Sequence, residues 1–391
     1  MKKILLLGGS PHQIPAIDYA KKQEYYTILC DFLPDNPGQY HADKFYCVST
    51  TDKEAVLEVA EKEKVDGVIA YASDPAAPTA AFVSETLGLP GNKYSIVKIM
   101  SEKDLFRNFL LKNGFNTPQF KFYSELNSLL SDFDTFDRPM ILKPVDSSGS
   151  KGVARIQNFR TIPALFAEAM NYSRCKRIIV EEYIDGPQLH GDAFVSNGKV
   201  VFSYLGDHYF NGMLNSSTMY PSQFPKGVIW EMEKELQRFI GLVGFQIGSI
   251  NVEFRISNRE KKFYIIEVGP RNGGHYTPNI IQYASGFNLI KASVDTALGI
   301  EFEPQETLKK GYYVNLVLYS MQSGIFQGVE FSENLRQHIL ETFINKKKGD
   351  EILSRSGSNT AVGVLLLNFR TMEEMHYYVD NSNKFYNILL N

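Results

Sequence analysis

The sequence has little cysteine and no long apolar run. Its three cysteines, Cys30, Cys47 and Cys175, are far apart and form no Cys-x-x-Cys pair. This argues against a disulfide framework or a cysteine zinc site and favours buried thiols in a reducing compartment. The opening MKKILLLGG has an apolar run of about four residues, whereas a signal peptide needs about 7 to 15 and a membrane-spanning helix about 18. We therefore predict a soluble, cytoplasmic protein with no membrane partner.

An excess of charge of either sign is also missing. The chain has 41 Lys and Arg residues against 44 Asp and Glu, for a net charge of -3. Its one short basic cluster, at 346–348, is more typical of a solvated loop than of a binding patch, so no nucleic-acid partner is predicted. What the chain does have is 391 residues, 43% of them hydrophobic. This is enough for several packed units and argues against disorder.

The first hundred residues alternate short apolar runs with helical patterns. The runs that indicate strands lie at 3–7, 27–31, 44–48 and 67–71. Such alternation predicts a parallel sheet covered by helices. The turn Gly8-Gly9-Ser10, with Asp31 about 20 residues later, partly matches a dinucleotide site. The G-x-G-x-x-G spacing is missing, however, so a structural turn is favoured over a nicotinamide site.

A hairpin with two glutamates is the most informative stretch. The runs 250–256 and 263–269 indicate strands joined by a polar loop. In an antiparallel hairpin centred on that loop, Glu253 lies opposite Glu267, and Cβ atoms of such a pair are about 4.5 to 5.5 Å apart. Two carboxylates this close repel each other. One therefore has a raised pKa, or an Arg or Lys lies between them, or a cation with oxygen ligands bridges them. A salt-bridged surface hairpin stays open as the alternative to a cation site.

Two lysines and a loop of small residues precede this hairpin. The helix predicted at 101–112 has Lys103 in its first turn, where an anionic ligand would offset the unfavourable interaction with the helix dipole. In the strand 140–145, MILKPV, Lys143 lies among apolar neighbours and needs an anionic partner. The loop 146–152, DSSGSKG, offers successive backbone N–H groups to an anion. It lacks a P-loop motif, so a mobile hairpin loop is the alternative.

A further strand ends in acidic and aromatic residues. It is RIIVEEYI at 177–184, followed by a Gly-Pro turn. Glu181 and Glu182 point to opposite faces, and either could accept a hydrogen bond from an exocyclic amine, although an exposed edge glutamate is the commoner outcome. Beyond residue 300, strand patterns at 313–319 and 362–368 with a helix at 372–380 predict a C-terminal α+β module.

The order of these features is more specific than any one of them. Along the chain they are Lys103, Lys143, the loop 146–152, the strand 177–184, Glu253, Glu267 and Arg271. This order resembles the ATP-grasp superfamily, in which two lysines and a flexible Gly/Ser loop hold the ATP phosphates, a strand-to-loop hinge holds adenine and paired acidic residues hold magnesium. EVGPRNGGHYT, beginning at Glu267, is similar to the ATPase subunit of phosphoribosylaminoimidazole carboxylase and to L-amino acid ligases.

The resemblance implies an α/β fold in three parts. These are an N-terminal parallel α/β domain at 1–100, a two-part ATP-grasp domain at 101–300 with a mobile lid at about 118–184, and a C-terminal α+β module at 301–391.

The resemblance also implies a role for each matching residue. The implied phosphate-binding residues are Lys103, Lys143, Ser147, Ser148, Gly149, Ser150 and Gly152. Glu181 would accept from the adenine amine, with Glu182, Tyr183 and the backbone of Ile184 in the hinge. Mg²⁺, with Mn²⁺ as an alternative, would be bound by Glu253 and Glu267, and Arg271 would be the catalytic residue facing the transferring phosphoryl group. The implied substrate residues are His208, Asn272, His275 and Tyr276.

Two positions depart from the family pattern. Gln188 stands where a ribose-binding glutamate is common, which leaves the ribose contact to a neutral amide or to another group. Gly269 stands where the family often has an asparagine ligand of magnesium, so that ligand is lost or is replaced by Asn272.

The implied activity is that of an ATP-dependent carboxylate–amine ligase on small-molecule substrates, with an acyl phosphate intermediate. A purine-pathway carboxylase ATPase subunit, acting on bicarbonate and an aminoimidazole ribotide, is the first alternative. A nucleotide-binding regulator without chemistry is the second. The sequence is compatible with a homodimer.

Overall fold

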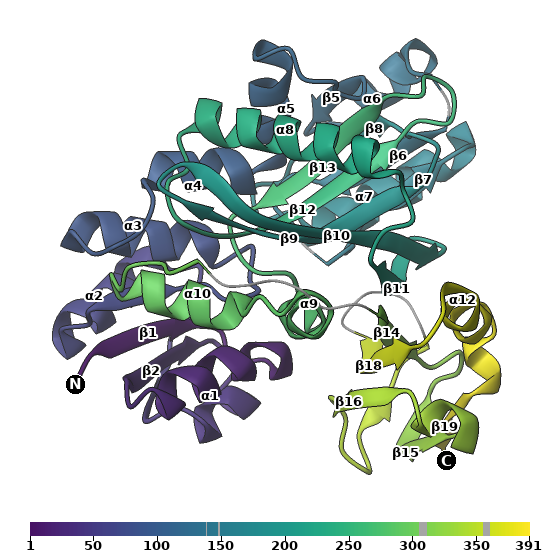
Figure 1. Cartoon of the computed structure of the whole chain (residues 1–391). Helices are drawn as coiled ribbons and strands as arrows, with labels where there is room; N and C mark the ends of the chain where they lie inside the picture. Colours follow the sequence, from purple (N-terminus) through teal and green to yellow (C-terminus); the bar gives the residue numbers. More distant parts are fainter. Residues whose placement is uncertain (138, 148, 305–310, 355–359) are drawn as a thin grey trace.

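The computed structural model describes residues 1–137, 139–147, 149–304, 311–354 and 360–391. Its N-terminal part is a parallel four-stranded sheet in the order β3-β2-β1-β4, as predicted (Figure 1). The elements are β1 (Lys3–Leu7), α1 (Ile14–Lys22), β2 (Tyr26–Asp31), β3 (Lys44–Cys47), α2 (Lys53–Glu63), β4 (Gly67–Ile69) and α3 (Ala77–Leu87), with 3-10 turns at Pro11–Gln13 and Pro37–Tyr40. Because side chains alternate along a strand, Leu5 and Leu7 pack with α2 and α3, whereas Ile4 and Leu6 pack with α1.

An eight-stranded sheet forms the centre of the molecule, in the order β13-β12-β9-β10-β11-β14-β18-β16. Its strands are β9 (Gln188–Ser196), β10 (Lys199–Asn211), β11 (Leu214–Tyr220), β12 (Gly248–Ile256), β13 (Phe263–Gly269), β14 (Tyr312–Tyr319), β16 (Ile339–Ile344) and β18 (Ala361–Phe369). One face is covered by α8 (Lys226–Val243), and α9 (Thr277–Ser285) and α10 (Leu289–Ala297) lie on the other (Figure 1).

The side chains of β9 show how this sheet separates core from site. Leu189, Ala193 and Val195 share a hydrophobic cluster with α8. Phe194, on the opposite face, shares a cluster with α9. Gln188, His190 and Asp192 have the same parity as Phe194, so the period of two places these polar residues on the face away from α8.

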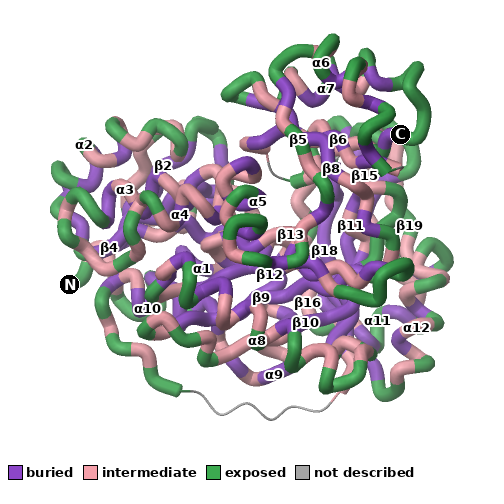
Figure 2. The backbone as a smooth tube through the Cα atoms, turned by 90° about the horizontal axis from the view of Figure 1, so that it is seen from above, coloured by how far each residue is buried: buried purple, intermediate pink, exposed green. Residues whose placement is uncertain are grey.

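A smaller antiparallel sheet projects from the central body. Its residues are those of the predicted lid, at about 118–184. It has the order β5-β8-β6-β7. Its elements are β5 (Phe120–Tyr123), α6 (Leu126–Asp132), β6 (Met140–Pro144), β7 (Ala154–Ile156), α7 (Ile162–Tyr172) and β8 (Ile178–Glu182), with 3-10 turns at Phe133–Thr135 and Phe159–Thr161. It has a hydrophobic cluster of its own, which includes Leu142, Ile156, Phe166 and Val180. In Figure 2 its outer helices α6 and α7 are largely exposed, while most strands of the central sheet are mainly buried, apart from the edge strand β16 and the ends of β10.

Three of the C-terminal strands, β14, β16 and β18, belong to the central sheet. β14 pairs with β11, so strands from both sides of the boundary predicted at residue 300 lie in one sheet. A second small sheet, β17-β15-β19, consists of β15 (Gly324–Phe331), β17 (Glu351–Ile352) and β19 (Tyr386–Leu390). The helices are α11 (Glu333–Arg336) and α12 (Met372–Asp380), with a 3-10 turn at Ser382–Lys384. The domain boundaries themselves stay predictions.

Two details differ from the expectations. The helix predicted at 101–112 begins at Lys103, as α5 (Lys103–Lys112), and Ser101 is instead the last residue of a preceding helix, α4 (Tyr94–Ser101). All three cysteines are free thiols, but only Cys30 is buried. In the described part of the chain, no helix is long and apolar enough to cross a membrane.

Candidate active site

Glu253 and Glu267 are direct partners in the β12–β13 hairpin, as the sequence predicted. Burial, and then the negative charge of Glu267, raise the pKa of Glu253 to about 7. Nε2 of Gln188 donates to Oε2 of Glu253 at 2.8 Å. Within the described ranges, no lysine or arginine forms an ion pair with either glutamate. Of the sequence alternatives, the hairpin therefore has the raised pKa and lacks the salt bridge.

The donor set of this pair fits a hard divalent cation. Carboxylate oxygens are preferred ligands of Mg²⁺, which is usually held by one or two carboxylates together with substrate phosphates and water. Among the residues that the structure describes, no group of three or more His, Cys, Asp or Glu side chains is arranged to hold a metal. The two glutamates would thus need phosphate oxygens or water to complete the coordination of a cation.

A cavity of about 370 Å³ adjoins Glu267 and collects the predicted phosphate residues. It is lined by Lys103, Lys143, Ser147 and Glu267, and also by Thr51, Lys53, Asp74, Arg107 and Arg174, which the sequence reasoning missed. Thr51, Lys53 and Asp74 belong to the N-terminal part of the chain. The cavity therefore lies between that part, the projecting sheet and the Glu253–Glu267 hairpin.

Lys143 and Glu181 form a buried ion pair on neighbouring strands of the projecting sheet, at 2.6 Å. Arg107 donates to the other oxygen of Glu181 through Nε, also at 2.6 Å. Burial raises the pKa of Glu181, but the charges of Arg107 and Lys143 outweigh it and lower that pKa to about 2. Burial lowers the pKa of Lys143 in spite of the attraction of Glu181. In this structure, therefore, the Glu181 carboxylate binds two cations, whereas the resemblance implied an adenine contact.

Arg107 was detectable from spacing, although the sequence reasoning passed over it. It lies one helical turn after Lys103 in α5, so both residues face the same side. Its side chain is among the largest that are fully buried. A buried arginine needs an anionic partner, and here Glu181 supplies it.

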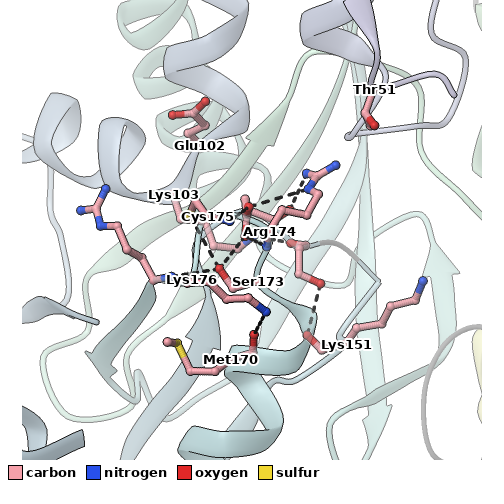
Figure 3. Close-up of polar contacts among 12 residues, drawn as sticks. Thr51, Glu102, Lys103, Lys151, Met170, Ser173, Arg174, Cys175 and Lys176 are labelled. Carbon is pink, nitrogen blue, oxygen red and sulfur yellow. Dashed lines mark hydrogen bonds and ion pairs between the residues drawn. The ribbon is translucent and has the colours of Figure 1, made fainter. Parts of the chain in front are cut away.

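The small-residue loop is anchored at its first two residues, whose partners Lys103, Ser173, Arg174 and Cys175 are labelled in Figure 3. The Asp146 carboxylate accepts from Oγ of Ser173 at 3.0 Å and from the backbone N–H of Cys175 at 2.9 Å. Nη2 of Arg174 donates to the Asp146 carbonyl at 2.6 Å. Nζ of Lys103 donates to the Ser147 carbonyl at 2.6 Å.

The rest of the loop has the backbone conformation of a tight turn. Ser148 lies outside the described residues. Gly149, Ser150 and Gly152 have φ values of +67°, +57° and +70°. At Gly152 a β-carbon would also lie 3.1 Å from Cα of Ala169 in α7, so this residue must stay small.

The predicted adenine hinge connects β8 to the central sheet. Glu182 accepts from the backbone N–H of Gln119 at 3.4 Å, and the Tyr183 ring lies 4.3 Å from the Arg155 guanidinium. The Ile184 carbonyl accepts from Nη1 of Arg255 at 3.3 Å. The same guanidinium donates to Oε1 of Gln188 at 2.5 Å, so Gln188 links the hinge to Glu253.

Arg271 is held by a residue from the N-terminal part. Its Nε and Nη2 lie 2.5 and 2.6 Å from the two carboxylate oxygens of Asp74, a bidentate pair. Although burial opposes the charged form, the Asp74 carboxylate raises the pKa of Arg271. Asp74 lies in an irregular turn between β4 and α3, where no short motif marked it in the sequence.

Of the four predicted substrate residues, His208 and His275 belong to a group of neutral histidines. The His208 ring lies over the His190 ring at 4.6 Å, and its Nδ1 is 2.7 Å from Oγ1 of Thr218. Burial lowers the pKa of His190 to about 3 and that of His275 to about 4. Burial also lowers the pKa of His208. All three are therefore uncharged at pH 7.

Asn272 and Tyr276 face other parts of the molecule. Oδ1 of Asn272 accepts from Ser293 at 3.0 Å, and the residue lines a separate cavity of about 100 Å³ between α3, α10 and β12. It therefore does not replace the ligand missing at Gly269. The Tyr276 ring stacks on Phe343 of β16 at 3.6 Å, inside the core.

Comparisons with known proteins agree with this geometry. A model of the ATP-grasp domain matches residues 136–279. The formate-dependent phosphoribosylglycinamide formyltransferase of Prochlorococcus marinus (strain NATL1A) is 26% identical over 390 residues, which cover 97% of this chain and 96% of that protein.

Two solved structures show the same fold over nearly the whole chain. An L-amino acid ligase from Bacillus licheniformis has a TM-score of 0.83 at 22% identity, covering 100% of this chain and 99% of that one. N5-carboxyaminoimidazole synthetase from Staphylococcus aureus, complexed with ADP, has a TM-score of 0.77 at 17% identity, with 98% and 97% covered. Residues 136–279 therefore match an ATP-grasp domain, and the chain as a whole has the fold of ADP-forming ligases that contain this domain.

Proposed function

We propose that the protein activates a carboxylate as an acyl phosphate and transfers the acyl group to an amine, on amino acids or other small metabolites, releasing ADP and phosphate. The observation that carries this proposal is the facing pair Glu253 and Glu267, with which no described lysine or arginine forms an ion pair, beside a cavity lined by Lys103 and Lys143. A polyphosphate with a divalent cation complements both charges at once.

The phosphates of ATP would lie in the cavity of about 370 Å³. Lys103, Lys143 and the backbone of the loop 147–152 would bind them, and the adenine would lie against the hinge at 182–184. Glu181 would act by holding Lys143 in place instead of touching the base. Gln188 would link the hinge to the metal side through its contacts with Arg255 and Glu253.

Glu253 and Glu267 would hold Mg²⁺, or Mn²⁺ in its place, and a bound cation would neutralise charge on the phosphate oxygens. Such a cation would also offset the burial and the repulsion by Glu267 that together raise the pKa of Glu253 to about 7. At a pH where Glu253 is still protonated, binding of the cation would therefore release that proton.

The chemistry has two steps. A substrate carboxylate oxygen attacks the γ-phosphorus, and ADP leaves with the electron pair of the broken P–O bond. Lys103, Lys143 and Arg271 offer positive charge to the equatorial oxygens. A neutral amine then attacks the acyl carbon, phosphate leaves with the electron pair of the C–O bond, and the amine loses a proton. The projecting sheet would close over the site, because water hydrolyses an acyl phosphate.

The histidines favour one substrate class over another. His190, His208 and His275 are uncharged at pH 7, so they offer hydrogen bonds without positive charge. Phosphate groups are bound best by charged arginine or lysine donors. This supports an amino acid or a similar small substrate over one that presents a phosphomonoester to these residues.

A purine-pathway activity is the second candidate. The formyltransferase similar to this chain acts on a phosphoribosyl compound, as its name states, and the match covers 97% of this chain. A regulator without chemistry is a weaker third candidate, since an ATP sensor needs neither paired metal ligands nor Arg271.

A phosphate-release screen tests the proposal. Amino acids, formate and bicarbonate serve as carboxylates, each offered with amino acids or phosphoribosyl amines as acceptors, and hydroxylamine traps the acyl phosphate as a hydroxamate. We expect magnesium-dependent phosphate release and a hydroxamate with one acid. A hydroxamate from formate, or activity with a phosphoribosyl amine, would establish the second candidate. ATP binding without phosphate release on any pair would refute the ligase proposal.

A further inference from the structure

The contact between Asp74 and Arg271 joins two distant parts of the chain at the reaction centre. Asp74 precedes α3 in the N-terminal part, and Arg271 follows β13. Two parallel contacts of 2.5 and 2.6 Å fix the plane of the guanidinium. Nη1 of Arg271 also donates to the carbonyl of Asn272 at 2.9 Å, so the guanidinium is held on two sides.

Gly269 provides the space for this pair. A β-carbon at residue 269 would lie 2.9 Å from Oδ1 of Asp74 and 3.3 Å from Nε of Arg271. The absence of a side chain at this position thus has a steric reason. At position 269, where the family pattern often has an asparagine, the space of the side chain is occupied by the Asp74 carboxylate and the Arg271 guanidinium.

The position of the guanidinium matters because two glutamates lie near it. Glu267 is two residues before Gly269 in β13, on the same face, at a spacing of about 6.8 Å along the strand. Within the described ranges, neither glutamate forms an ion pair with a lysine or arginine, although the charge of Arg271 acts on both from a distance. An arginine released from Asp74 would be free to form an ion pair with Glu267, whose charge already acts on it, and such a pair would compete with a bound cation.

We propose that Asp74 is a positioning residue. It holds the Arg271 guanidinium beside Gly269 and so prevents a direct ion pair with the facing glutamates, leaving their oxygens free for a divalent cation. The inference rests on the proposed function, because it takes the glutamates as the metal site. It assigns Gly269 a complementary role, since any larger residue there would displace the carboxylate.

Binding of Mn²⁺ in the presence of ADP tests this inference without turnover. Free Mn²⁺ is measured by electron paramagnetic resonance for the wild type and for D74N, G269A and the double variant D74N/R271A. ADP is used because it lacks the γ-phosphate that Arg271 would face. We expect D74N and G269A to bind Mn²⁺ about 10-fold or more weakly, as is typical when a residue supporting a metal ligand is lost. D74N/R271A should regain most of the wild-type affinity, since the competing charge is gone.

The matched control is D18N, which removes another N-terminal aspartate that forms an ion pair, with the exposed His41. It should bind Mn²⁺ like the wild type. Wild-type affinity in D74N, or a double variant as weak as D74N, would overturn the inference. If D74N does not fold, G269A makes the same comparison with Asp74 intact. Failure of the wild type itself to bind Mn²⁺ with ADP would instead refute the metal assignment in the proposed function.

Discussion

Nζ of Lys143 lies 2.6 Å from Oε2 of Glu181, across the β6–β8 pair of the projecting sheet. The sequence suggested separate tasks for these two residues, one at the phosphates and one at adenine. Glu181 also pairs with Arg107, so the three charges are buried together. A substitution at Glu181 should therefore affect the stability of the protein.

Glu181→Gln should destabilise the protein. The change leaves Arg107 and Lys143 buried without a negative charge, and breaking a buried pair in this way costs about 3 to 5 kcal/mol. Urea denaturation should show this loss in the free energy of unfolding. Glu182→Gln is the control, because the Glu182 side chain is more exposed and its ion pair with Arg259, at 3.5 Å, is long. Unchanged stability with a raised KM for ATP would support an adenine contact instead.

Glu267→Gln should abolish turnover while the fold is retained. The amide keeps the size of the side chain but removes the negative charge that a divalent cation needs, so we expect kcat to fall about 100-fold or more. Circular dichroism and the melting temperature check the fold. A folded variant with wild-type activity would rule out Glu267 as a metal ligand.

Glu253→Gln should stabilise the metal-free protein at alkaline pH. The pKa of Glu253 is raised from 4.5 to about 7 on folding. Between these values the folded state keeps a proton that the unfolded state has lost, so stability falls as the pH rises through this window. Glutamine has no such loss. We expect E253Q to be more stable than the wild type by about 1 to 3 kcal/mol at pH 8, with a smaller difference at pH 5.

Urea titrations at both pH values measure this difference. Adding Mg²⁺ with ADP should stabilise the wild type more than E253Q, because only the wild type keeps the full ligand pair. An equal difference between the two proteins at both pH values would contradict the raised pKa.

Ser173→Ala should loosen the small-residue loop. The substitution removes a hydrogen bond of 3.0 Å to Asp146 and a second one to the backbone N–H of Arg177. Each is worth about 0.5 to 1.5 kcal/mol. Hydrogen exchange should become faster at 146–153, and the KM for ATP should rise. Ser131→Ala, which removes an exposed hydrogen bond in α6, is the control and should leave both unchanged. Unaltered exchange in the loop would show that Ser173 does not anchor it.

The local part of the site followed from the sequence for a physical reason. The register of an antiparallel hairpin depends on its strands and loop, so the facing of Glu253 and Glu267 could be derived from about 20 residues and is confirmed. The dipeptide Asn197-Gly198 is a strong hairpin signal, and it forms the turn between β9 and β10 with the positive φ values, +52° and +71°, that these residues favour. The parallel N-terminal sheet followed from alternating patterns in the same way.

The missed features depend on contacts between distant segments. Asp74 and Arg271 are 197 residues apart, and Arg107 and Glu181 are 74 apart. No local sequence pattern distinguishes Asp74, because aspartates are common in turns. Its role depends on Arg271, which only the folded chain places beside it. Asn272 was a plausible metal ligand by position, but the packing of α10 provides Ser293 as its partner.

The sequence by itself determined the strand patterns, the opposed glutamates and the ordered set of lysines and small residues, because these depend on spacing along one segment. The tertiary structure decided which charges neutralise one another. Lys143 is paired with Glu181 and Arg271 with Asp74, while no described cation pairs with Glu253 or Glu267. Electrostatic energy depends on separation in space, and only the folded chain sets that separation.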